Sequence, residues 1–236
     1  MPRFFIDTEP LGDIYTITGA DAVHIGRSLR MRIGDELTLC RRGKEYLCRI
    51  EGFTTDTVTV EIMSAQPSAN EPSLRLTVYQ ALPKSDKAEH IIQKCTELGA
   101  SEFVFFESKR CVARLTDRDK KLVRYERIAL EAAKQSGRGM VPQVRYIPDM
   151  QEAVRELVTH ESPLICYEKD GARLSDIAVT SDTAVMIGSE GGFDREEAEL
   201  AAKMGARPIW LGNRILRCET APVAVTAILM HMFGDI

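Results

Sequence analysis

The chain has 236 residues, a formal net charge of −4 and 44% hydrophobic residues. This length allows one large domain or two small ones, and the apolar content is sufficient for a hydrophobic core. No run of 18 apolar residues occurs, and the N-terminal residues are too polar for a secretory signal, so we expect a cytoplasmic protein without a membrane anchor.

The cysteines and histidines do not form a metal-binding pattern. No Cys-x-x-Cys pair occurs, and the four histidines lack the spacing of ligands, so we expect no metal site. The six cysteines lie in or beside apolar runs, and a chain of this size needs no disulfides, which predicts reduced and mostly buried thiols. They are Cys40, Cys48, Cys95, Cys111, Cys166 and Cys218.

The first part of the chain, residues 1–68, alternates short β-like segments with turns. The expected strands are Arg3–Ile6, Ile14–Ile17, Glu36–Cys40, Tyr46–Ile50 and Thr57–Ile62, with one helix from Asp21 to Leu29. This spacing predicts a small β-barrel domain. The polar segment Gln66–Ser73 contains two prolines and is interpreted as a linker.

Strands and helices alternate over residues 73–236, which predicts an α/β domain with a parallel sheet and helices on both faces. The expected strands are Leu74–Ala81, Phe103–Phe106, a segment near Val144, Pro163–Cys166, Thr183–Ile187 and Pro208–Leu211. The expected helices are Lys84–Leu98, Thr116–Ser136, Met150–Val158, one capped by Asp194 with Glu197 in a capping box, and Thr220–Phe233.

Two glycine-marked stretches near the C-terminus are the candidate active site. Each one, Ile187–Phe193 and Leu211–Ala221, follows a strand and precedes a helix. Glycines let the backbone approach a ligand closely, and two such turns at one edge of a sheet make a natural ligand crevice.

Three common site motifs do not account for these stretches. Ser189 lies next to Gly188, but the position two residues before Ser189 is Ile187, so the Gly-x-Ser-x-Gly pattern of a hydrolase nucleophile is not met. The phosphate-binding loop of nucleotide hydrolases is absent, and no Gly-x-Gly-x-x-Gly follows a strand. The sequence therefore lacks the motifs that usually indicate nucleotide hydrolysis or dinucleotide redox chemistry.

Two basic runs occur in this acidic chain. Residues 27–49 hold seven basic side chains against three acidic ones, and residues 109–145 hold eleven against four. Such runs can be solvated helix faces, but two of them favour a partner that carries phosphates.

The two glycine stretches together resemble the C-terminal signatures of the SPOUT superfamily of RNA methyltransferases, and most closely those of its RsmE family. Further blocks that resemble the family are Ala81–Lys84, Gln93–Gly99, Glu131–Arg138 and His24–Arg30. They occur in order over most of the chain. One departure is Ser189, where the family usually has proline.

The resemblance implies a fold, a cofactor and a reaction. The fold is a PUA-like RNA-binding barrel (residues 1–68) followed by an α/β methyltransferase domain (residues 73–236) whose C-terminal chain forms a trefoil knot. The cofactor is S-adenosylmethionine (SAM), and the reaction is methylation of N3 of a uridine in the 16S rRNA of the small ribosomal subunit. A homodimer packed through the knot region is also implied. The apolar final helix suits such a dimer, or an intramolecular core.

The resemblance also assigns residues to a SAM pocket. The expected cofactor-binding residues are Ile187, Gly188, Glu190, Gly191, Gly192, Leu211, Gly212, Ile215, Leu216, Arg217, Thr220 and Ala221. Two of these have alternative roles. Glu190 either contacts the ribose or caps the nearby helix, and Thr220 is expected to cap the final helix.

Arg217 and Glu219 are the expected catalytic residues. Methylation of uracil N3 requires loss of a proton and stabilisation of the resulting charge on the carbonyl oxygens, which a guanidinium does well. The alternative for Arg217 is a structural salt bridge with Glu219. Glu219 either orients Arg217 or acts as the base, and the proton can equally pass to solvent.

RNA contacts are expected from basic residues, because phosphates dominate such interfaces. The candidates are Arg3, Arg27, Arg30, Lys84, Lys94, Arg110 and Arg138. Two other functions stay open at this stage: the same fold acting on another base or ribose oxygen of rRNA or tRNA, and a non-catalytic RNA-binding assembly factor.

Overall fold

The computed structural model describes residues 1–167 and 171–236, and their contacts divide into two compact units. The first unit comprises Met1–Glu71 and Gly137–Val141, and the second comprises Pro72–Ser136 and Pro142–Ile236. The return of residues 137–141 to the first unit was not expected from the sequence, because no local pattern marks it.

The first unit is a five-stranded mixed sheet curled around its own core. Its strands are β1 (Arg3–Phe5), β2 (Ile14–Thr18), β3 (Glu36–Arg41), β4 (Lys44–Phe53) and β5 (Thr57–Pro67), in the spatial order β1-β3-β4-β5-β2. Only β1 and β3 pair in parallel. All five predicted strands are confirmed, although β5 extends to Pro67, into the segment interpreted as a linker.

The core of this unit follows from alternation along the strands. In β4, Tyr46, Cys48 and Ile50 are buried while the residues between them are less so, as expected for a strand with one face on a core. A short helix, α1 (Gly19–Val23), continues into a π-helical turn at His24–Ser28, close to the predicted helix.

The segment 137–141 is held by one carboxylate. Glu71 accepts hydrogen bonds from the backbone amides of Gly139 (2.8 Å) and Met140 (3.0 Å), and its other oxygen lies 2.7 Å from the guanidinium of Arg138. The prediction that Arg138 contacts RNA is therefore corrected, because this side chain is 2% exposed and its charge is compensated within the unit.

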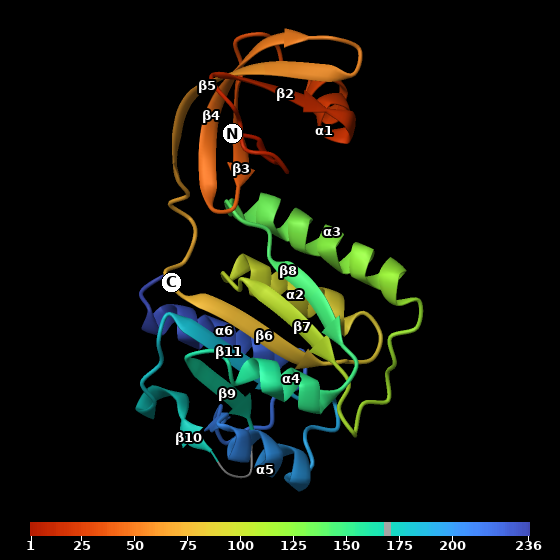
Figure 1. The fold of residues 1–236 in the computed structure, drawn as a ribbon, viewed down its shortest axis with the longest axis vertical. Coiled ribbons are helices and arrows are strands. Elements are labelled where there is room, and N and C mark those ends of the chain that lie inside the picture. Colours follow the sequence, from red (N-terminus) through yellow and green to blue (C-terminus); the bar gives the residue numbers. More distant parts are fainter. Residues whose placement is uncertain (168–170) are drawn as a thin grey trace. The chain divides into compact units, whose positions relative to one another are not determined.

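The second unit is a seven-stranded sheet in which every recorded pairing is parallel (Figure 1). Its strands are β6 (Arg75–Ala81), β7 (Glu102–Phe106), β8 (Gln143–Ile147), β9 (Ser162–Cys166), β10 (Ala172–Arg173), β11 (Asp182–Ile187) and β12 (Arg207–Trp210). Their spatial order is β10-β12-β9-β11-β6-β7-β8. The predicted parallel sheet is confirmed; β10 and the 3-10 turn Leu174–Asp176 were not predicted.

Helices cover both faces of this sheet. They are α2 (Lys87–Glu97), α3 (Arg118–Ser136), α4 (Met150–Leu157), α5 (Arg195–Met204) and α6 (Thr220–Met232). Helices α2, α3 and α6 form one layer, and α4 and α5 lie on the opposite face. No described helix combines the length and the apolar character needed to cross a membrane.

The helix caps partly follow the sequence prediction. The capping box of Asp194 and Glu197 at α5 is confirmed. The predicted cap by Thr220 is wrong: Thr220 is already inside α6, and the capping position is held by Glu219, whose side chain makes no capping bond. The six cysteines are free and five of them are buried, as predicted.

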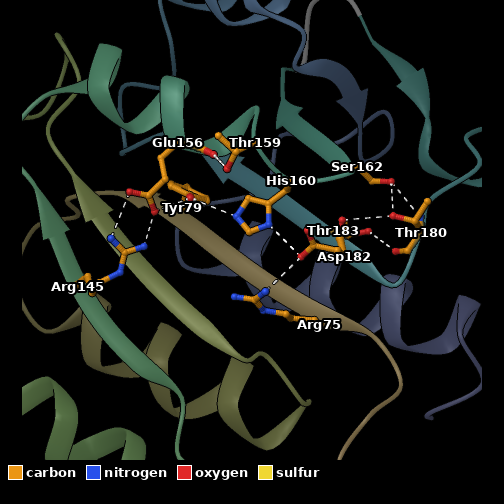
Figure 2. Close-up of polar contacts among 10 residues, drawn as sticks. All are labelled: Arg75, Tyr79, Arg145, Glu156, Thr159, His160, Ser162, Thr180, Asp182 and Thr183. Carbon is orange, nitrogen blue, oxygen red and sulfur yellow. Dashed lines mark hydrogen bonds and ion pairs between the residues drawn. The ribbon is translucent and has the colours of Figure 1, made fainter.

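A polar network ties α4 to the sheet (Figure 2). The hydroxyl of Tyr79 on β6 donates to Glu156 on α4 (2.9 Å) and lies 3.4 Å from Nε2 of His160, whose Nδ1 is 3.1 Å from Asp182. Arg145 on β8 pairs with Glu156. Burial raises the pKa of Tyr79, so its hydroxyl stays a donor. The network therefore gives hydrogen-bond partners to polar side chains beneath α4, and burying these side chains without partners would lower the stability of the fold.

The ion pair of Glu156 predicts a pH-dependent stability. The hydrogen bond from Arg145 holds the pKa of Glu156 below its usual range. The stabilisation is present above the unfolded-state pKa of about 4.3 and is lost as pH falls through the folded-state value. Urea unfolding should show wild type more stable than Glu156→Gln at pH 7, with the difference shrinking as pH falls below about 5.

The matched control is Glu152→Gln, on the exposed side of the same helix. It should follow wild type throughout. If Glu156→Gln lowered the free energy of unfolding by the same amount at every pH, the ion pair of Glu156 with Arg145 would not be the source of the stabilisation.

Candidate functional site

The candidate site lies where the order in which the chain adds strands to the sheet reverses, between β6 and β11. From β6 the chain adds β7 and β8 on one side, while β11, β9 and β12 lie on the other, so the loops after β6 and β11 diverge at the carboxyl ends of neighbouring strands. Such a switch point is the usual ligand position in an open parallel sheet.

A cavity of about 550 Å³ opens at this edge. It is lined by both predicted glycine stretches together with residues at the carboxyl ends of β9 and β12 and at the start of α2. Of the predicted cofactor residues, those that line it are Ile187, Gly188, Glu190, Gly191, Gly192, Leu211, Gly212, Ile215, Leu216, Arg217 and Ala221. Among the described residues, Thr220, the first residue of α6, is the one member of the predicted set that is missing from the lining.

The first loop is a tight turn that requires glycine at Gly188. A Cβ atom on Gly188 would lie 3.0 Å from the backbone of Gly192, and the amide of Gly192 closes the turn on the carbonyl of Ser189 (2.9 Å). The side-chain amide of Gln80 on β6 donates to the carbonyl of Gly188 (3.0 Å), which fixes the turn to the neighbouring strand.

The second loop offers backbone groups to a ligand. It turns at Gly212, whose φ of +115° favours glycine. Within the described chain, no amide from residue 212 to 218 donates a hydrogen bond to another protein group. Ile215 in this loop is 87% exposed. The loop therefore presents free donors beside apolar side chains.

A lysine that the sequence reading missed joins the two loops. The ammonium of Lys87, in the first turn of α2, lies 3.0 Å from Glu190 in the first loop and 3.2 Å from Glu219 in the second. Glu190 also accepts from the backbone amide of Lys84 (3.0 Å). The helix-cap alternative for Glu190 is therefore wrong, since Asp194 caps α5.

The charges in this cluster are fixed by their contacts. Partial burial raises the pKa of Glu190, but hydrogen bonds from Lys84 and Lys87 outweigh it and leave the pKa below its usual range. Burial also raises the pKa of Glu219, but hydrogen bonds from its own backbone amide, from Cys218 and from Lys87 outweigh it and leave the pKa below its usual range. Burial raises the pKa of the Cys218 thiol to about 12, so this thiol is not a nucleophile at neutral pH.

Arg217 is exposed at the edge of the cavity. Its side chain forms no ion pair with any residue that the structure describes, and Glu219 is paired with Lys87 instead. The alternative of a structural Arg217–Glu219 salt bridge is therefore wrong, and so is the expectation that Glu219 orients Arg217.

The RNA-binding candidates differ in availability. Arg27, Arg30 and Lys84 are exposed. Arg110 donates to the carbonyl of Gly191 (3.0 Å) and so sits beside the first loop.

Two other candidates are held by acidic partners. Arg3 pairs with Glu45 (2.7 Å), and Lys94 pairs with Glu97 (2.8 Å) in the same helix turn.

The cavity is suited to a nucleoside-sized ligand. Its volume lies within the range of small-molecule sites. Free amides of the second loop can bind a heteroaromatic edge, and Ile187, Leu211 and Leu216 supply apolar walls. A nucleoside attached to a cationic chain would also meet the carboxylates of Glu190 and Glu219.

Several lining residues were missed because they depend on strand order. Cys166 ends β9 and Tyr167 follows it, Trp210 ends β12, and Lys87 begins α2. The strand ends were visible in the sequence, but the order that brings β9, β11 and β12 together was not.

The comparisons with known proteins identify the family. The RNA methyltransferase domain family matches residues 70–230, and the RNA methyltransferase PUA domain family matches residues 17–63. Ribosomal RNA small subunit methyltransferase E of Bacillus subtilis (strain 168) is 33% identical over 245 residues, covering 97% of this chain and 96% of the relative. The chain belongs to the small subunit methyltransferase E family.

Solved structures of similar proteins carry the cofactor. The methyltransferase E of Neisseria gonorrhoeae, bound to S-adenosyl methionine, superimposes with a TM-score of 0.84 at 30% identity, over 99% of this chain and 98% of that one. A methyltransferase from Legionella pneumophila in complex with SAM gives 0.85 at 29% identity, over 98% and 97%. The family resemblance read from the glycine stretches is thus confirmed.

The turn at Gly188 gives a prediction for the loop. Gly188→Ala adds a Cβ atom that must displace the backbone of Gly192, so the free energy of unfolding in urea should fall by about 1–3 kcal/mol. Gly52→Ala is the matched control, because its Cβ meets nothing within 4 Å. A Gly188→Ala variant as stable as the Gly52→Ala variant would show that the loop is not closely packed.

Proposed function

We propose that the chain is a SAM-dependent methyltransferase that methylates N3 of a uridine in the 16S rRNA of the small ribosomal subunit, as a cytoplasmic homodimer. The observation that carries the proposal is the one cavity that both glycine loops form, with Arg217 exposed at its edge. The names of the relatives support the rRNA substrate, and the SAM-bound neighbours support the cofactor.

The residues of the cavity would hold SAM by complementary chemistry. The amides of the second loop and the walls of Leu211 and Leu216 would take the adenine, while Glu190 is in reach of the ribose or the cationic centre. When bound, SAM supplies an electrophilic methyl group. The chain's own residues then have to hold the uracil, favour loss of its N3 proton and exclude water.

Arg217 is the proposed catalytic residue. Among the described residues the Arg217 guanidinium has no ion-pair partner, so it can donate to a uracil carbonyl oxygen, where negative charge gathers once N3 has lost its proton. Glu219 is a poor base, because its contacts hold its pKa below the usual range. We therefore assign the proton to solvent and give Glu219 the task of holding the second loop.

The remaining assignments of the proposal concern RNA and assembly. Residues 1–68 would bind RNA through exposed side chains such as Arg27 and Arg30, and residues 73–236 would form the knotted methyltransferase domain. On α6, Ile228 and Met232 are 41% and 40% exposed. These two apolar side chains lie one turn apart on the same face of α6, so a second copy of the chain could cover them, which supports a homodimer through this helix.

The proposed reaction is tested by its product. Unmodified small subunits should be incubated with the protein and labelled SAM, and the nucleosides analysed by mass spectrometry. We expect labelled 3-methyluridine at a single site. Label in another nucleoside would redirect the substrate assignment, and the absence of label in any nucleoside would overturn the enzymatic assignment.

Arg217→Ala should lower turnover about 100-fold or more while SAM affinity stays near that of wild type, by analogy with loss of one transition-state donor. Steady-state kinetics and calorimetry measure the two quantities. Arg207→Ala, an exposed arginine at the start of β12, is the matched control and should behave as wild type. Loss of SAM affinity with unchanged turnover at saturation would make Arg217 a cofactor ligand instead.

A further inference from the structure

The two glycine loops belong to different strand–helix connections, and a side chain from a third connection joins them. Glu190 lies in the loop after β11 and Glu219 in the loop after β12, whereas Lys87 lies in the first turn of α2, after β6. One ammonium contacts both carboxylates, at 3.0 and 3.2 Å. The side chains of Lys87, Glu190 and Glu219 are 28%, 31% and 18% exposed, so the cluster is screened only in part.

The charge balance of the cluster makes Lys87 important. Two carboxylates bound to one ammonium lie near enough to repel each other, and the repulsion acts directly between the two loops. With Lys87 present, both stay ionised and the cluster carries one net negative charge. A cationic ligand is favoured by that charge. Without Lys87, the same carboxylates separate or one of them takes up a proton.

The other charged groups near the cluster do not replace Lys87. Arg110 is engaged with the carbonyl of Gly191, and the Cys218 thiol donates to Glu219 (3.2 Å) without adding positive charge. Among the residues that the structure describes, the remaining charged or titratable side chains around it are Lys84, Asp86, Tyr167, Arg214 and Arg217. Within the described chain, none of these five is recorded in a side-chain contact with Glu190 or Glu219.

We propose that Lys87 is a positioning residue: it holds the two glycine loops at the spacing of the cavity by neutralising the repulsion between Glu190 and Glu219. It acts through the loops and touches neither reacting atom. This inference rests on the proposed function, in that the ligand held between the loops is SAM. Its mechanism predicts that removing one carboxylate charge compensates for loss of the lysine.

The experiment compares Lys87→Met, Lys87→Arg, Glu190→Gln and the double variant Lys87→Met/Glu190→Gln. Glu190→Gln keeps an oxygen for the amide of Lys84 while it removes the charge. Lys203→Met, an exposed lysine on α5, is the matched control. SAM affinity is measured by calorimetry from pH 5.5 to 8. Amide hydrogen exchange is measured without ligand at Gly192 in the first loop and at Thr220 and Ala221 at the end of the second, because these amides are hydrogen-bonded to loop carbonyls.

We expect Lys87→Met to weaken SAM binding about 10-fold or more at pH 8 and to recover part of it toward pH 5.5, where one carboxylate takes up a proton. Lys87→Arg should bind SAM with an affinity within a few-fold of that of wild type. The double variant should bind SAM with an affinity within a few-fold of that of Glu190→Gln. Both loops should exchange faster in Lys87→Met and return to the slower rate in the double variant.

Two results would overturn the proposal. One is a Lys87→Met affinity equal to that of wild type, and the other is a loss that neither low pH nor the second substitution reduces. If wild type itself binds no SAM, the proposed function fails, and the hydrogen-exchange comparison still decides whether Lys87 restrains the loops.

Discussion

The parallel pairing of β6 with β11 brings together two segments that are far apart in the chain. The hydrogen bond from Gln80 to the carbonyl of Gly188 spans 108 residues and links the end of β6 to the first glycine turn. Every feature of the cavity depends on this pairing. It sets the start of α2 beside the first loop, and the addition of β9 and β12 next to β11 brings in the second loop.

The cavity built on this pairing combines rigid and charged parts. Gly188 permits a turn whose backbone packs against itself, and the capping box at Asp194 fixes the helix that follows. The carboxylates of Glu190 and Glu219 share one lysine, and in the described part of the chain neither of them forms an ion pair with Arg217. Arg217 is exposed at the cavity edge and so is available to a substrate, and this division of charges links the architecture to the proposed chemistry.

Local patterns predicted the elements well, because hydrophobic periodicity and caps act over a few residues. The strands from Arg3 to Trp210 other than β10, the α-helices and the capping box at Asp194 follow from such signals. The glycine stretches also marked the cavity correctly, because a tight turn after a buried strand leaves a chemical signature in the sequence.

Contacts between distant residues could not be predicted in this way. No local signal shows that Glu71 binds Arg138 or that Lys87 reaches Glu219, since both depend on how the chain folds back over long separations. The same limit explains the wrong salt bridge between Arg217 and Glu219. Proximity along the chain suggested it, but the turn before α6 directs the carboxylate toward α2.

A crystal structure of the protein with SAM tests most directly the claim that the two loops form one cofactor pocket. We expect a cofactor in contact with both loops, with its adenine against the amides of residues 212–218 and its methyl group directed toward Arg217. A cofactor bound by one loop alone, or at another place on the sheet, would contradict it.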